Sequence, residues 1–151
     1  MSQKMVLAAS VSIIQENKVL IIKENKSYAI NKWNFPGGRI EYGEDILYSA
    51  CREVKEETGF DVELNGTTGV YNFSSNTDDQ VILFHFTGKI IGGSLQLEEE
   101  IISESMWMKA TDLLLVDYEQ LREPKVFRQI TDKLIKKDIH SIDIFNKQLN
   151  R

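Results

Sequence analysis

The segment 37–60 constrains this chain most strongly, because it joins a glycine-rich turn to a helix with an unusual charge pattern. Paired glycines open the segment, and their backbone freedom predicts a loop over residues 37–43. Residues 44–58 predict a single helix. Gly59 then stands where a left-handed residue commonly ends a helix. A loop, one helix and a second turn are therefore expected here, whatever surrounds them.

Two faces of this helix follow from a rotation of about 100° per residue. One face is acidic and carries Glu53, Glu56 and Glu57, whose charges repel at these spacings. The other face suits packing on a sheet, and its members are Leu47, Ala50, Cys51, Val54 and Thr58. A divalent cation would relieve the repulsion fully, and carboxylate oxygens suit Mg²⁺ or Mn²⁺. Taken alone, the acidic face is also compatible with an ordinary solvated helix surface.

Composition limits the classes of protein that remain. The chain has 151 residues, 42% of them hydrophobic and 27% charged, which predicts one globular domain over residues 1–151. A net charge of −5 provides no basic field for nucleic acid or for an anionic membrane. The single cysteine excludes an internal disulfide and suits a reducing compartment. With no signal peptide and no long apolar run recognised, we expect a cytoplasmic protein.

The rest of the chain predicts strands and one further long helix. The expected strands are a hairpin of 5–14 with 19–23, then 33–36, 61–64, 67–73, 80–90 and 105–108, with loops over 24–32 and 74–79. Thr111 and Asp112 are expected to cap a short helix over 113–116, and residues 123–137 to form an amphipathic helix. Residues 138–151 receive no assignment. The natural architecture is α/β (α+β), with two helices around a mixed sheet.

The spacing within 38–60 resembles the signature of the Nudix (MutT-type) hydrolases. Gly38 is followed after five residues by Glu44, and after seven more by the run REVKEETGF, which matches the signature at every specified position. The run W-x-F-P-G of residues 33–37 extends the resemblance upstream. The resemblance implies the Nudix fold, a mixed β-sheet sandwiched between helices, with the signature as loop–helix–loop.

The resemblance also implies an activity. Such an enzyme is an Mg²⁺-dependent (or Mn²⁺-dependent) pyrophosphohydrolase, which cleaves the diphosphate linkage of a nucleotide or nucleoside diphosphate derivative by attack of a metal-activated water. Glu53, Glu56 and Glu57 are then the expected metal ligands, with the carbonyl of Gly37 as a further ligand. Glu53 is also the first choice for general base.

Other signature residues receive supporting roles. Arg52 is expected to orient Glu53, and the alternative is a plain surface pair with Glu56. Glu44 is expected to tie the loop to the helix, while Gly38 and Gly59 shape the backbone.

Outside the signature the candidates are weaker. Glu100 and Glu104 are candidates for a further metal ligand or base, whereas the neighbouring Glu98 and Glu99 fit a solvated charge run. Arg39 is a candidate for a phosphate contact, with a surface arginine as the alternative. His85 is interpreted as a half-buried strand residue rather than a catalytic one.

The sequence leaves the substrate open. Candidates are an oxidised or normal nucleoside triphosphate, a nucleotide sugar, a dinucleoside polyphosphate and a non-nucleotide pyrophosphate. One alternative function is a non-catalytic nucleotide-binding or regulatory Nudix module; another is an enzyme of RNA 5′ ends, which the acidic balance disfavours. We expect a small-molecule phosphoanhydride substrate, no nucleic-acid or membrane partner, and a monomer or homodimer.

Overall fold

The computed structural model describes residues 3–150. The elements in chain order are β1 Met5–Gln15, β2 Lys18–Lys26, β3 Ala29–Asn34, β4 Gly37–Arg39, α1 Ile46–Thr58, β5 Phe60–Ser74, β6 Gln80–Gly93, β7 Ile102–Met108, α2 Ala110–Leu113, the 3₁₀ turn η1 Tyr118–Gln120, α3 Pro124–Lys136 and the 3₁₀ turn η2 Ile142–Ile144. Among these residues no helix is both long and apolar enough to cross a membrane.

One mixed seven-stranded sheet organises the molecule. Its strand order is β3-β2-β1-β6-β5, with β4 added to β1 and β7 added to β2. The pairing of β1 with β6 is parallel, and the other pairings are antiparallel. Because β1 pairs with β6 along most of its length and with β2 only at its end, it joins the two halves of the sheet.

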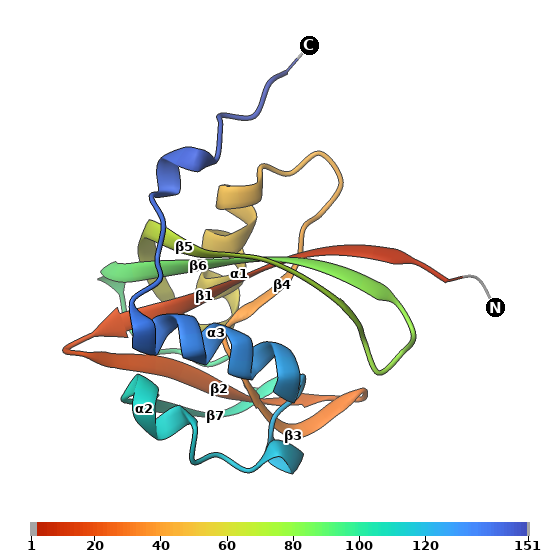
Figure 1. Cartoon of the computed structure of the whole chain (residues 1–151), viewed down its shortest axis with the longest axis vertical. Coiled ribbons are helices and arrows are strands. Elements are labelled where there is room, and N and C mark those ends of the chain that lie inside the picture. Colours follow the sequence, from red (N-terminus) through yellow and green to blue (C-terminus); the bar gives the residue numbers. More distant parts are fainter. Residues whose placement is uncertain (1–2, 151) are drawn as a thin grey trace.

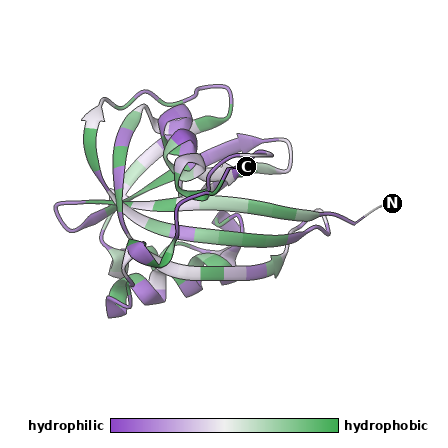
Figure 2. Cartoon of the chain, turned by 90° about the horizontal axis from the view of Figure 1, so that it is seen from above, coloured by the Kyte–Doolittle hydropathy of each residue, from purple (hydrophilic) through white to green (hydrophobic). Residues whose placement is uncertain are grey.

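Helices cover both sides of this sheet, with α1 on one side and α3 on the other (Figure 1). The α1 side buries an apolar cluster that includes Val11, Ile13 and Val54, and the α3 side buries one that includes Phe35, Phe127 and Ile130. Hydrophobic residues follow the strands, whereas the C-terminal segment is mainly hydrophilic (Figure 2). The predicted mixed sheet between helices is therefore confirmed.

The alternation of side chains along β1 separates these two clusters. Ala9, Val11 and Ile13 are fully buried on the α1 side. Ser10 and Ser12 between them point to the opposite face, as successive residues of a strand must. Two buried hydroxyls therefore lie on the α3 side of the sheet.

The predicted hairpin is confirmed, but the predicted loop over 24–32 is wrong. Glu16 and Asn17 have positive φ and form a two-residue turn of the type that matches strand twist. Strand β2 continues to Lys26, and β3 already begins at Ala29. The polar residues of β2 can be buried because Glu24 pairs with Lys26 at 2.8 Å.

Three further boundaries differ from prediction. The helix α1 begins after Asp45, which accepts a hydrogen bond from the Tyr48 N–H at 3.0 Å and is thus the cap rather than a first-turn residue. The strands predicted at 61–64 and 67–73 form one bulged strand, β5, because its pairing with β6 continues past the glycines. The short helix α2 starts earlier than predicted, at Ala110, and has no side-chain cap.

The tail without a predicted structure packs on the domain. The His140 N–H donates to the Thr67 carbonyl at 2.8 Å, and Ile142 and Phe145 pack against the α1-side cluster. Gln148 Nε2 donates to the Gly43 carbonyl at 3.0 Å. Residues after α3 therefore cover apolar surface beside α1.

Two glycines with similar backbone angles should respond differently to alanine. Gly59 has φ of 84°, and a Cβ there would lie 2.3 Å from the Ser94 carbonyl oxygen. Gly43 has φ of 78°, but a Cβ there would meet nothing within 4 Å. We expect Gly59→Ala to lower the free energy of unfolding by about 2–4 kcal/mol and Gly43→Ala by about 1 kcal/mol, measured by urea denaturation. Equal losses would contradict this packing at the end of α1.

Candidate functional site

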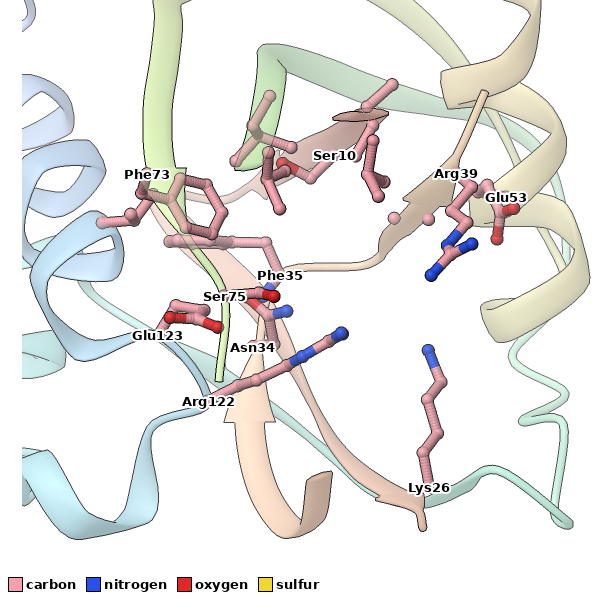
Figure 3. Close-up of a pocket in the computed structure, with 18 of the residues that line it drawn as sticks. Ser10, Lys26, Asn34, Phe35, Arg39, Glu53, Phe73, Ser75, Arg122 and Glu123 are labelled. Carbon is pink, nitrogen blue, oxygen red and sulfur yellow. The ribbon is translucent and has the colours of Figure 1, made fainter. Parts of the chain in front are cut away.

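A cavity of about 380 Å³ lies between the two helical layers. Strands β1, β2, β4, β5 and β6 contribute to its walls, together with α1 and the start of α3. Figure 3 shows Glu53 and Arg39 at one end and Phe35, Phe73 and Glu123 at the other. The cavity therefore joins a charged end to an apolar end.

The charged end contains a deeply buried carboxylate, that of Glu57, whose side chain is 2% exposed. Its Oε1 accepts a hydrogen bond from the Gly37 N–H at 2.8 Å, and its Oε2 lies 3.5 Å from Lys26 Nζ. Burial raises the pKa of Glu57 to about 8, although Lys26 and the Gly37 N–H both oppose the rise. The signature thus places an acid where ionisation needs a nearby cation.

Glu53 lines the same end of the cavity and explains the glycine at position 38. A Cβ on Gly38 would lie 2.5 Å from the Glu53 carboxylate, so only glycine allows the side chain to approach β4 this closely. Burial raises the pKa of Glu53, and the Arg52 guanidinium opposes that rise. Both Glu53 and Glu57 are therefore held against the glycine pair.

Arg52 connects the loop to the acidic face. It donates to both carboxylate oxygens of Glu44, and to Glu53 and Glu56 at 3.1 Å each. It also donates to the Arg39 carbonyl at 3.2 Å. The two alternatives for Arg52, contact with Glu53 and pairing with Glu56, are thus present together, and Glu44 links the loop to α1 through this guanidinium.

Glu56 lies apart from the other two carboxylates. Its side chain is 56% exposed and does not line the cavity. Within residues 3–150, no three acidic, histidine or cysteine side chains converge as a ready metal cluster. In this arrangement the three glutamates contact internal cations, Arg52 for Glu53 and Glu56, and Lys26 for Glu57.

The donor set nevertheless fits a divalent cation. Glu53 and Glu57 offer hard oxygen ligands at the wall of a cavity, which suits Mg²⁺ or Mn²⁺. The Lys26 ammonium already occupies the neighbourhood of Glu57 as an internal cation. Gly37 also lines this end, but the contact seen with Glu57 is made by its N–H, so ligation by its carbonyl stays a prediction.

Sequence reasoning missed a second buried carboxylate, Glu24, opposite the signature. Its side chain is 2% exposed and lies 2.8 Å from Lys26 Nζ and 3.1 Å from Arg122 Nη1. The Arg122 guanidinium also lies 5.0 Å over the ring of Tyr28. Glu24 thereby fixes two cations that line the cavity. The signal that could have found it is the polar run 24–26, which lies in the predicted loop 24–32 but forms the end of β2.

The apolar end is formed by side chains from several elements. Phe35 stacks on Phe127 with ring centroids 4.6 Å apart. The other apolar lining residues are Phe73, Leu83, Val126 and Ile130, and polar ones at this end are Asn34, Ser75 and Glu123. This end can hold a flat ring with a few polar contacts.

The remaining predicted residues are placed as follows. Arg39 lines the cavity beside Glu53. Glu104 pairs with Lys23 at 3.0 Å on an exposed surface, and neither it nor Glu100 lines the cavity. His85 is fully buried rather than half-buried, and each of its ring nitrogens has a serine hydroxyl as its partner, which makes this burial tolerable.

Comparisons with known proteins identify members of one family. A family model described as the NUDIX domain matches residues 4–130. The putative 8-oxo-dGTP diphosphatase of Bacillus subtilis (strain 168) is 30% identical over 124 residues, which are 82% of this chain and 76% of that protein. The ADP-ribose pyrophosphatase of Methanocaldococcus jannaschii is 34% identical over 90 residues, 58% of this chain and 53% of that protein.

A solved structure shows the same likeness over nearly the whole chain. The NUDIX hydrolase from Nitrosomonas europaea has a TM-score of 0.81 at 26% identity, and the match covers 96% of this chain and 98% of that one. The family model and the relatives place the chain among pyrophosphate-bond hydrolases, and the chain belongs to the Nudix hydrolase family. The predicted family, fold and enzyme class are confirmed.

The raised pKa of Glu57 predicts how stability depends on pH in the metal-free protein. Its pKa rises from 4.5 to about 8 on folding, so between these values the folded state binds more protons than the unfolded chain. The free energy of unfolding should therefore fall as pH rises from about 5 to 8. In the variant Glu57→Gln the side chain cannot ionise but can still accept a hydrogen bond from the Gly37 N–H. The free energy of unfolding of this variant should therefore fall less steeply with pH. Urea unfolding at several pH values with a chelator measures both slopes, and identical slopes would contradict the assignment.

Proposed function

We propose that this protein is a divalent-metal-dependent pyrophosphohydrolase acting on a nucleotide or nucleoside diphosphate derivative. The observation that carries the proposal is that one and the same cavity joins buried carboxylates to an apolar end. A diphosphate fits the charged end and a heteroaromatic ring fits the apolar end. The intact set of signature residues favours turnover over a non-catalytic binding module.

The residues of α1 supply the chemistry at the charged end. When bound, Mg²⁺ or Mn²⁺ withdraws electron density from the phosphorus and lowers the pKa of a water molecule. Glu53 accepts the proton of the attacking water, and burial, which raises its pKa, makes it a stronger base than an exposed glutamate. Arg52 holds Glu53 in place. Glu57, and the more exposed Glu56 on the same helix, would supply carboxylate oxygens for the cation.

Cations across the cavity hold the phosphate groups. Lys26 and Arg122 are kept in place by Glu24, and Arg39 lines the cavity near Glu53. Their positive charge complements the phosphate oxygens that the carboxylates would repel. Figure 3 shows the head groups of all three in the same space as Glu53.

The names of two relatives support a small-molecule substrate. The named activities, on 8-oxo-dGTP and on ADP-ribose, share a purine nucleotide that carries a phosphoanhydride. We propose a purine nucleotide of this kind as the substrate. The single cysteine and the net charge of −5 support our proposal of a cytoplasmic enzyme without a nucleic-acid partner.

Replacing Glu53 tests the proposed chemistry. Glu53→Gln keeps the size of the side chain but removes its ability to accept a proton, so kcat should fall by about 10²–10⁴-fold. The assay is release of phosphate or pyrophosphate from 8-oxo-dGTP, dGTP and ADP-ribose with Mg²⁺.

A matched control uses an exposed glutamate. Glu63 pairs with Lys89 at 3.5 Å on the surface, so Glu63→Gln should leave kcat within twofold. The assignment of Glu53 as general base is wrong if both variants keep the wild-type kcat. Metal-dependent nucleotide binding without turnover by the wild-type protein would favour the non-catalytic module instead.

A further inference from the structure

A buried histidine lies directly behind the cavity wall. Nδ1 of His85 is 2.6 Å from Ser10 Oγ, and Nε2 is 2.7 Å from Ser12 Oγ. Turning the ring by 180° would place carbon atoms against both hydroxyls, so the two contacts fix the ring orientation. Phe35 packs against the ring with centroids 4.9 Å apart. The ring therefore has one position and a partner for each nitrogen.

The imidazole is neutral under ordinary conditions. Burial lowers the pKa of His85 to about 3. In a neutral imidazole one nitrogen donates and the other accepts. Exactly one of the two serines must therefore donate to the ring, and the other must accept from it.

The surroundings of the two serines decide between these tautomers. Ser12 is 0% exposed, and His85 is the hydrogen-bond partner recorded for its hydroxyl within residues 3–150. A buried hydroxyl whose hydrogen has no acceptor is costly, so the Ser12 O–H must donate to Nε2. Nδ1 then carries the hydrogen and donates to Ser10 Oγ. Ser10 can tolerate this arrangement because it lines the cavity.

The consequence is a directed donor in the cavity wall. Ser10 Oγ receives a hydrogen bond from His85 on its buried side, so its own hydrogen is available on the cavity side. Figure 3 shows Ser10 between the phenylalanines of the apolar end and Glu53. A ligand ring in the apolar end would present its edge to this hydroxyl.

We propose that Ser10 is a specificity-determining residue that donates a hydrogen bond to an acceptor, a carbonyl oxygen or ring nitrogen, on a heteroaromatic group bound in the apolar end. His85 and Ser12 are positioning residues, because they hold the Ser10 hydroxyl as a donor. The identity of the ligand rests on the proposed function, whereas the direction of the hydrogen bonds does not. A ring edge that presents an N–H at this position is disfavoured, because it would use the second lone pair of Ser10 Oγ and leave the Ser10 hydrogen without an acceptor on the ligand.

The tautomer can be measured in the wild-type protein without any ligand. Long-range ¹H–¹⁵N correlation spectra of the ¹⁵N-labelled protein distinguish protonated from unprotonated ring nitrogens. The signals of His140, whose side chain is 59% exposed, are identified by their absence from the spectrum of His140→Asn. We expect His85 to show a protonated Nδ1 and a bare Nε2, unchanged between pH 5.5 and 8. A protonated Nε2 would overturn the proposal.

A pair of serine variants tests the role in binding. Each of Ser10→Ala and Ser12→Ala removes one hydroxyl from His85, but only Ser10 faces the cavity. The probes are AMP, GMP, CMP and UMP with Mg²⁺, titrated by calorimetry. For the best-bound probe we expect Kd to rise about 5–20-fold with Ser10→Ala and by less with Ser12→Ala, which frees the His85 tautomer but keeps the Ser10 hydroxyl. The exposed control Glu63→Gln should keep Kd within twofold of the wild-type value.

Three results would overturn the proposal: equal effects of the two variants, no effect of either, or no binding of any probe to the wild-type protein. Failure of the proposed function is a separate result, namely binding of a probe without hydrolysis of any nucleotide in the panel. The tautomer measurement decides the donor direction even if Ser10→Ala does not fold.

Discussion

The buried carboxylate of Glu57 is the feature on which the site depends. It is held at the end of α1 by the Gly37 N–H and by Lys26, and burial raises its pKa to about 8. An isolated buried carboxylate is expensive to ionise, so the surrounding structure must supply compensation. The Gly37 N–H and Lys26 supply it, whereas the negative charge of the buried Glu24 beside Lys26 opposes the ionisation of Glu57.

The same requirement explains why distant segments meet at one cavity. Strand β4 needs a glycine at position 38, because a Cβ there would collide with the Glu53 carboxylate on α1. Strand β2 buries Glu24 and Lys26 opposite, and Glu24 in turn fixes Arg122 just before α3. The charged end of the cavity is thus a balanced set of buried acids and bases. The apolar end follows from the packing of Phe35, which comes just after β3, and of Phe73 on β5 beside α3.

Much of the fold could be predicted from the sequence, since strong periodicities and glycine positions define α1, the hairpin and α3. The same holds for the placement of Glu53 and Glu57, because helical spacing alone puts them on one face. The pairing of Glu24 with Arg122 could not be predicted, because it joins residues 98 positions apart through tertiary packing. Nor could the burial of His85, which depends on the parallel pairing of β6 with β1 and hence on two serines far away in the chain.

The central claim is that the Glu53 and Glu57 end of the cavity is built for a divalent cation. Calorimetric titration of Mn²⁺ into the wild-type protein and into Glu57→Gln tests it most directly, with Glu63→Gln as the exposed control. Losing a ligating carboxylate should weaken Mn²⁺ binding by at least about tenfold, while the control should bind like the wild-type protein. Equal Mn²⁺ affinity in all three proteins would contradict the account.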